Sequence, residues 1–226
     1  MGLCLALWRG VDSTRSPLQP LEEVFRMGCR YIGQNPNPAT LAEEARRTLN
    51  ANIGPQRIRH YLDFLDSSLL LRTIEPLEIR LKKRRGYSKL CLRDHAIRAA
   101  WLQESVPLAP AVLDRVPHLH DLAGRIAEST AGYFFASLTG LSVAHLPERA
   151  SEPEVDFILT IGERRIPVEV KYRPAVDPRD TLGLRVFIEK AVNNAPFGLL
   201  ITRGDTPAAA DPRIITVPLP SLLVVR

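Results

Sequence analysis

The sequence predicts a mixed α/β (α+β) protein in which a helical module with a basic hairpin precedes a unit ordered helix, three strands, helix, strand. Three observations predict this architecture. Apolar residues recur at helical spacing over residues 55–66, and apolar and polar residues alternate with the period of a strand over residues 154–171. Three prolines between residues 107 and 117 mark a connection between the two parts.

The composition is that of a globular protein. Of 226 residues, 45% are hydrophobic and 24% are charged, which excludes collagen, coiled-coil and mucin-like chains. The longest apolar runs, residues 3–8 and 222–225, are far shorter than the roughly 18 residues of a membrane helix. The first residues lack a basic segment and an apolar stretch long enough for a signal peptide. We therefore expect a cytoplasmic protein without a membrane partner, whose three scattered cysteines are reduced and structural.

Positive charge is concentrated in the first half. Residues 1–104 hold 17 Lys and Arg against 11 Asp and Glu, whereas residues 105–226 hold 13 against 14. Such an asymmetry favours a polyanionic partner for the first half, most often nucleic acid. Solubility alone explains many basic proteins, so this alternative stays open.

The first part contains two predicted helices. Residues 1–38 are expected to be irregular or helical, and Asn-Pro-Asn-Pro at 35–38 predicts a loop. Thr40, with Glu43 three residues later, has the pattern of a capping box and opens a helix that ends near residue 50. A second, amphipathic helix is predicted over residues 55–66.

Strand-like segments at 69–74, 78–81 and 89–92 follow, around a basic turn. Helix, turn, helix and basic hairpin make up a winged helix, predicted for residues 39–104, which places one helix in a DNA groove and its wing on phosphates. A solvated hairpin or a protein adaptor is the alternative. The candidate DNA-binding residues are Arg57, Arg59, Arg80, Lys82, Lys83, Arg84, Arg85 and Lys89.

The second part, residues 105–226, has a regular alternation of predicted elements. A helix over about residues 119–138 opens it, and a second helix follows the third strand. Strands are predicted at 141–146, 154–161, 166–172, 197–202 and 213–217, and the second helix at 180–192.

The central feature of this part is a β-hairpin. Gly162-Glu163 suits a two-residue loop, which would pair Ile161 with Arg164 and place Asp156 opposite Glu169. Strand alternation then adds Lys171 to the face of the two acids. On the opposite face, which we expect to be core, lie Val155, Phe157, Leu159, Ile161, Ile166, Val168 and Val170. Pro167 cannot donate to a ladder and is expected at an edge or at a position without a hydrogen bond.

Two carboxylates opposite each other repel, and a divalent cation would compensate for this. Mg²⁺ binds a few carboxylates and waters and leaves room for a phosphate oxygen. Lys171 could then orient or deprotonate the attacking water. Without metal, replacing Asp156 by Ala should relieve repulsion and cost no stability. The alternative is a surface hairpin with a Glu169–Lys171 salt bridge.

Glu128 is a third candidate acid. It lies four residues from both Gly124 and Gly132, so another backbone could approach its side of the helix closely. A carboxylate among apolar residues is an unusual surface residue. A buried glutamate bonded to a backbone amide is the alternative.

Together these residues resemble the PD-(D/E)XK nuclease superfamily. The resemblance rests on Glu128 in the initial helix, Asp156 on one strand, and Glu169-Val170-Lys171 on the next, in the order αβββαβ. Val155 replaces the proline of the motif. The resemblance implies a restriction-endonuclease-like core and metal-dependent DNA cleavage, in relatives of Holliday-junction resolvases that act on branched DNA.

The stretch from about residue 31 to 225 also resembles the DUF4143 region of prokaryotic AAA-type ATPases, where a winged helix precedes a nuclease-like domain. The segments that carry this resemblance are residues 89–94, 124–128, 154–158 and 167–171. Those ATPases have a P-loop, and this chain has no G-x-x-x-x-G-K-[ST]. It is therefore expected to act without binding ATP in that way.

The predicted function is a metal-dependent DNA endonuclease that uses Mg²⁺ or Mn²⁺. As implied by the resemblance, the metal ligands are Asp156, Glu169, the Val170 carbonyl and Glu128, and the catalytic residues are Glu128, Asp156, Glu169 and Lys171. The alternative is an inactive nuclease-fold module that binds DNA, a separate ATPase or a second copy of itself. A transcription regulator would leave the acidic residues unexplained.

Overall fold

The computed structural model describes residues 18–78, 86–148, 152–205 and 209–224. In the first part, three helices pack around an apolar core that includes Met27, Leu41 and Ile58, and a two-stranded antiparallel sheet closes it. A further helix follows the sheet. The elements of this part are α2 (Gln19–Arg30), α3 (Pro38–Leu49), α4 (Pro55–Ser67), β1 (Leu71–Ile74), β2 (Lys89–Leu92) and α5 (His95–Leu102).

The second part is built on a five-stranded sheet in the order β3-β4-β5-β6-β7. β3, β4 and β5 pair antiparallel, whereas β5, β6 and β7 pair parallel. The chain is therefore a mixed α+β protein, as predicted. The helices of this part are α6 (Pro110–Leu113), α7 (His120–Ser137), α8 (Leu182–Glu189) and α9 (Leu219–Leu223). Its strands are β3 (Ser142–Leu146), β4 (Val155–Ile161), β5 (Arg164–Lys171), β6 (Gly198–Thr202) and β7 (Ile214–Pro218).

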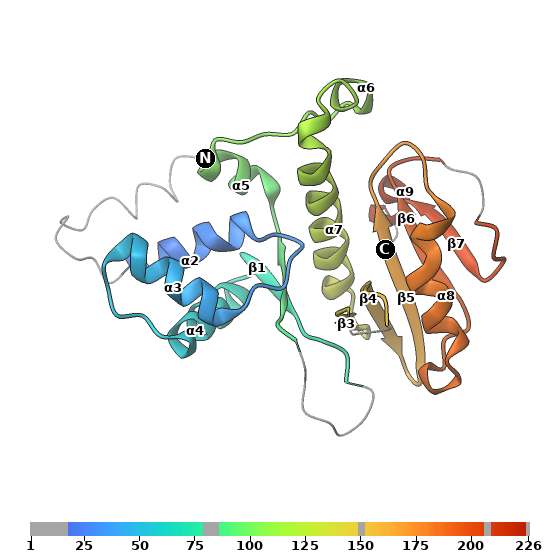
Figure 1. Ribbon diagram of the computed structural model, residues 1–226, viewed down its shortest axis with the longest axis horizontal. Coiled ribbons are helices and arrows are strands. Elements are labelled where there is room, and N and C mark those ends of the chain that lie inside the picture. Colours follow the sequence, from blue (N-terminus) through green and yellow to red (C-terminus); the bar gives the residue numbers. More distant parts are fainter. Residues whose placement is uncertain (1–17, 79–85, 149–151, 206–208, 225–226) are drawn as a thin grey trace.

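Helix α7 lies between the first part and the sheet (Figure 1). Its small residues Ala127 and Ala131, with Phe135, pack against the sheet at spacings of four residues. Leu122 and Ile126 pack against the core of the first part instead. One helix thus contributes to two apolar cores.

Helix α8 covers the opposite face of the sheet (Figure 1). Leu184 and Phe187 of this helix bury Ile158 and Leu200. Apolar residues therefore cover both faces, as is usual for a sheet that contains parallel strands. Core residues are thus not confined to the face of the hairpin on which they were expected, because Ile158, two residues from Asp156, is completely buried.

The two parts of the chain are also joined through backbone hydrogen bonds. Pro76 forms a parallel bridge with His145 of β3. Leu77 N donates to His145 O at 2.8 Å, and His145 N donates to Glu75 O at 3.0 Å. Cys91 of β2 lies in the same core as Phe157 of β4. The first part and the sheet therefore share packing and hydrogen bonds.

Of two local predictions, the helix cap needed revision and the one for Pro167 did not. Helix α3 starts at Pro38, and Asn37 rather than Thr40 caps it, accepting a hydrogen bond from Ala39 N. Proline suits the first helical position because it lacks the N–H that would be unsatisfied there. Pro167 lies in the central strand β5 but before the register shared with β6, which begins at Val168.

In the described part of the chain, no helix is long and apolar enough to cross a membrane.

Candidate functional site

The candidate site forms around an irregularity between β3 and β4. Ala144 pairs with Ile158, but the next pair is Leu146 with Val155, so two residues of β4 lie opposite His145 alone. These two residues are Asp156 and Phe157. Such a bulge changes the direction in which side chains point, and bulges are frequent next to active sites.

The bulge explains one error in the predicted hairpin. Phe157 packs in the α7 core with Val168 and Val170, as expected. Val155, expected beside Phe157, packs with α8 instead, next to Ile158. The extra residue shifts the alternation of β4 by one position. Asp156 is thereby brought to a carboxylate of α7 and to a lysine of β2.

That lysine is Lys89, whose side chain is only 1% exposed. Its Nζ lies 2.5 Å from Glu128 Oε1 and 3.5 Å from Asp156 Oδ1. Glu154 Oε1 is a third neighbour, also at 3.5 Å. Burial by itself would lower the pKa of Lys89, but the three carboxylates outweigh burial and hold this pKa above its ordinary value. Lys89 is therefore an ammonium ion inside the protein.

This position corrects the expectation that Lys89 contacts DNA. A side chain so completely enclosed presents no charge to a phosphate backbone. The one sign in the sequence was that the apolar residues Leu90-Cys91-Leu92 follow Lys89; in the structure all four residues form the fully buried strand β2. Nothing in the sequence indicated that residues 39 and 67 positions further along would be its partners.

Asp156 is also bonded to the hairpin. Its Oδ2 accepts a hydrogen bond of 2.9 Å from Val170 N, next to Glu169. The predicted register is confirmed, because Ile161 pairs with Arg164 and Phe157 with Val168. These contacts change the expectation for Asp156→Ala: without metal it should now destabilise the protein, because it removes a buried hydrogen bond and a partner of Lys89.

Glu169 and Lys171 form an ion pair at the end of β5. Within the described residues, the second oxygen of Glu169, Oε2, is buried and has no hydrogen-bond partner. Burial, together with the charge of Asp156, raises the pKa of Glu169 to about 8. Burial would lower the pKa of Lys171, but Glu169 and Asp156 outweigh it and raise this pKa. Lys171 thus keeps its charge, which favours orienting a water over deprotonating it.

Glu128 reaches the site from α7. Burial and the charge of Asp156 raise its pKa to about 7, against the opposing effect of Lys89. Gly33, at a φ of +67°, lies so close that a Cβ would be 3.4 Å from Glu128 Oε2. A close approach exists at Gly132, but it is made by side chains rather than by the expected backbone: a Cβ there would lie 2.6 Å from Cys91 Sγ. At Gly124 the described residues leave the space open.

The remaining predicted residues belong to the proposed DNA-binding face. Arg57 and Arg59 are exposed on α4, and Arg57 donates a hydrogen bond to Tyr61 Oη at 3.0 Å. The other predicted contacts, Arg80, Lys82, Lys83, Arg84 and Arg85, lie outside the described residues.

In the residues that the structure describes, no group of three or more His, Cys, Asp or Glu side chains is arranged to hold a metal ion.

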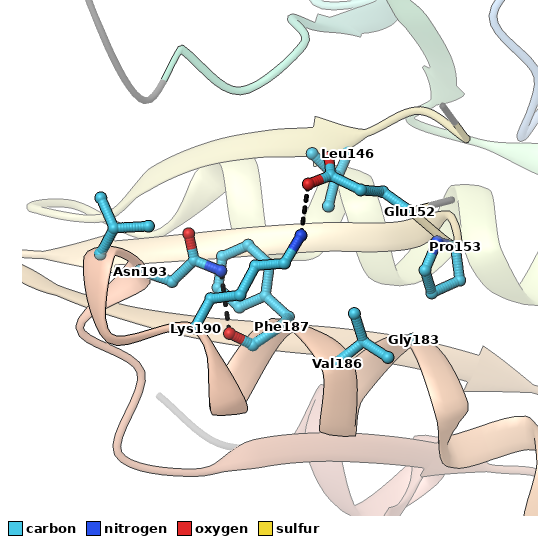
Figure 2. A pocket seen from close by; sticks show the side chains of 9 residues that line it. Leu146, Glu152, Pro153, Gly183, Val186, Phe187, Lys190 and Asn193 are labelled. Atoms are coloured by element: carbon cyan, nitrogen blue, oxygen red, sulfur yellow. Dashed lines mark hydrogen bonds and ion pairs between the residues drawn. The ribbon is translucent and has the colours of Figure 1, made fainter. Parts of the chain in front are cut away.

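Figure 2 shows a small cavity of about 80 Å³ on the α8 side of the sheet. An ion pair between Lys190 and Glu152 spans it, and Asn193 Nδ2 donates to Phe187 O at 2.8 Å. Ligand pockets commonly measure some 300–1,000 Å³. This cavity is therefore too small for a nucleotide, and it is not part of the candidate site.

Comparison with known proteins gives one family match. Residues 132–222 match the family described as "Domain of unknown function (DUF4143)", a narrower range than the resemblance expected over residues 31–225. A similar solved structure is that of protein VC1899 from Vibrio cholerae, at 12% identity and a TM-score of 0.32. That alignment covers 93% of this chain and 55% of the other, so this chain spans about half its length. No curated protein matches the sequence.

Proposed function

We propose that this chain, whose residues 132–222 match the DUF4143 family, is a metal-dependent DNA endonuclease with Asp156, Glu169 and Lys171 at its active site. The observation that carries the proposal is the environment of Glu169. Its Oε2 is buried without a hydrogen-bond partner among the described residues, and the carboxylate of Asp156 acts on it electrostatically. Buried acceptors normally have a hydrogen-bond donor or a cation as a partner, and in this proposal the metal ion is that partner.

The residues fit a magnesium ion bound by few protein ligands. Mg²⁺ commonly takes one or two carboxylates and completes its shell with waters and substrate phosphate oxygens. Asp156 and Glu169 would hold it, with the Val170 carbonyl as a third ligand. When bound, Mg²⁺ stabilises negative charge on the phosphate.

Three basic residues would contact the DNA. The ammonium of Lys171, partly exposed at 28%, would contact a phosphate oxygen or hold the attacking water. It stays charged because Glu169 and Asp156 raise its pKa. The exposed Arg57 and Arg59 of α4 would contact the DNA backbone, which fixes position rather than sequence.

Nicking of supercoiled plasmid DNA and cleavage of branched DNA test the proposal. With Mg²⁺ or Mn²⁺ we expect cleavage by the wild type and a loss of about 100-fold or more in Lys171→Ala, because its charge acts mainly in the transition state. Lys190→Ala is the matched control: it removes a lysine of another ion pair, with Glu152, and should cleave normally. If the wild type and Lys171→Ala give the same metal-dependent rate, the proposed active site is wrong.

A second candidate is the non-catalytic module, which would bind DNA, a separate ATPase or another copy of the chain. The ammonium of Lys89 favours it, because this charge already compensates Glu128 and Asp156 without a metal. The same assay separates the two functions: the module would bind DNA but leave it intact with every metal and every variant.

A further inference from the structure

The acidic side chains Glu128, Glu154, Asp156 and Glu169 form what we call the acidic cluster. The cation at its centre comes from the first part of the chain. Lys89 belongs to β2, whereas its partners Glu128 and Asp156 belong to α7 and β4. Its Nζ also lies 5.2 Å from the centre of the Phe157 ring. Such enclosure is rare for a lysine, which is seldom fully buried unless it is paired.

The contacts divide the cluster into two halves. In one half, Lys89 Nζ is within 3.5 Å of an oxygen of Glu128, Glu154 and Asp156. In the other half, Glu169 pairs with Lys171 through Oε1 and leaves Oε2 buried and unpartnered in the described structure. A carboxylate cluster of this kind needs positive charge, which protein or metal can supply.

We propose that the Lys89 ammonium takes the place of one divalent cation between Glu128 and Asp156, so that Glu128 serves this lysine and binds no metal ion. The inference rests on the proposed function for the other half of the site, where Glu169 stays available. It changes the role expected for Glu128, from metal ligand to partner of Lys89. It also makes Lys89, which touches no substrate, a positioning residue for Asp156.

The variant Lys89→Met tests whether this lysine takes the place of a metal ion, because methionine keeps much of the side-chain volume and lacks the positive charge. Without metal, Lys89→Met leaves the largely buried Glu128 and Asp156 without their ammonium partner, so its melting temperature should fall well below that of the wild type. Titration with Mn²⁺ should then show one more bound ion per chain than in the wild type. Mn²⁺ should also raise the melting temperature of Lys89→Met more than that of the wild type.

Two further variants make the result specific. Lys89→Met/Glu128→Gln removes the ammonium together with one carboxylate, so it should fold without metal more readily than Lys89→Met and lose the additional Mn²⁺ ion. Lys190→Met removes the lysine of another ion pair and should bind Mn²⁺ like the wild type.

The inference is overturned if Lys89→Met binds no more Mn²⁺ than the wild type, or if it stays unfolded at saturating Mn²⁺. The second outcome contradicts the inference because a Mn²⁺ ion in the place of the ammonium should restore the folding of Lys89→Met. The proposed function is tested separately, by whether the wild type cleaves DNA. An additional Mn²⁺ ion in Lys89→Met with no cleavage by the wild type would support the role of Lys89 and refute the nuclease.

Discussion

Glu169 carries a buried carboxyl group whose protonation affects folding. In the folded protein its pKa is raised to about 8, by burial and by Asp156. In the unfolded chain a glutamate titrates near 4.3. Between these values the folded state holds more protons than the unfolded state. The free energy of unfolding therefore decreases as pH rises through this range.

The effect of Glu169 falls largely between about pH 6.5 and 8, where Glu128, with its pKa raised to about 7, contributes in the same direction, so comparison with Glu169→Gln isolates the part due to Glu169. His95 and His145, whose pKa values burial lowers to about 4, change stability in the opposite direction, but below the ordinary histidine pKa. With chelator present, we expect the wild type to lose roughly 1–2 kcal/mol between pH 6.5 and 8. Urea denaturation of the wild type and Glu169→Gln checks this, and equal slopes in the two proteins would contradict it.

Individual site residues were predictable to different degrees. Asp156, Glu169 and Lys171 lie within one hairpin, so strand alternation and the turn at Gly162 were enough to bring them together. Lys89 was assigned to DNA because a lysine in a basic stretch is usually solvated. Its burial depends on packing between β2 and α7, and no local pattern encodes that contact.

At the scale of elements, α7 depends on a close approach at one glycine. A Cβ at Gly132 would lie 2.6 Å from Cys91 Sγ and 2.7 Å from the Phe157 ring, whereas one at Gly124 would meet none of the described residues within 4 Å. We expect Gly132→Ala to destabilise the protein by about 1–3 kcal/mol through overpacking. The matched change Gly124→Ala should stabilise it by up to about 1 kcal/mol, because Ala favours the helix.

Chemical denaturation of the two alanine variants measures both effects. Opposite signs would establish that the cost at Gly132 comes from packing rather than from helix propensity. Destabilisation of similar size at Gly124 would contradict the packing explanation.

Most helices and strands of the second part were predicted within a few residues, because their apolar periodicity is strong. The helix over 119–138 corresponds to α7 (His120–Ser137), and the strand at 154–161 to β4 (Val155–Ile161). The bulge at Asp156 was missed, since it depends on how β4 pairs with β3 and not on β4 alone. Helix α5 was also missed, although Asp94 caps it by accepting from Ala96 N at 2.7 Å.

At the scale of the whole molecule, the two parts depend on each other. Ile74 and Cys91 of the first part belong to the apolar core that includes Phe157 and Val168. We expect residues 105–226, expressed alone, to lose cooperative thermal unfolding. This core would lack Ile74 and Cys91, and Glu128 and Asp156 would lack Lys89. Co-expression with residues 1–104 should restore cooperative unfolding. A sharp transition for the isolated fragment, measured by circular dichroism, would contradict this dependence.

His145 fixes both ends of the segment that joins β1 to β2. Its carbonyl accepts from Leu77 N, and its ring Nε2 lies 2.9 Å from Tyr87 O, two residues before Lys89. Through this one residue, β3 therefore holds the chain both after β1 and before β2. The position of Lys89 next to Glu128 and Asp156 thus depends on His145 as well as on the pairing of β1 with β2.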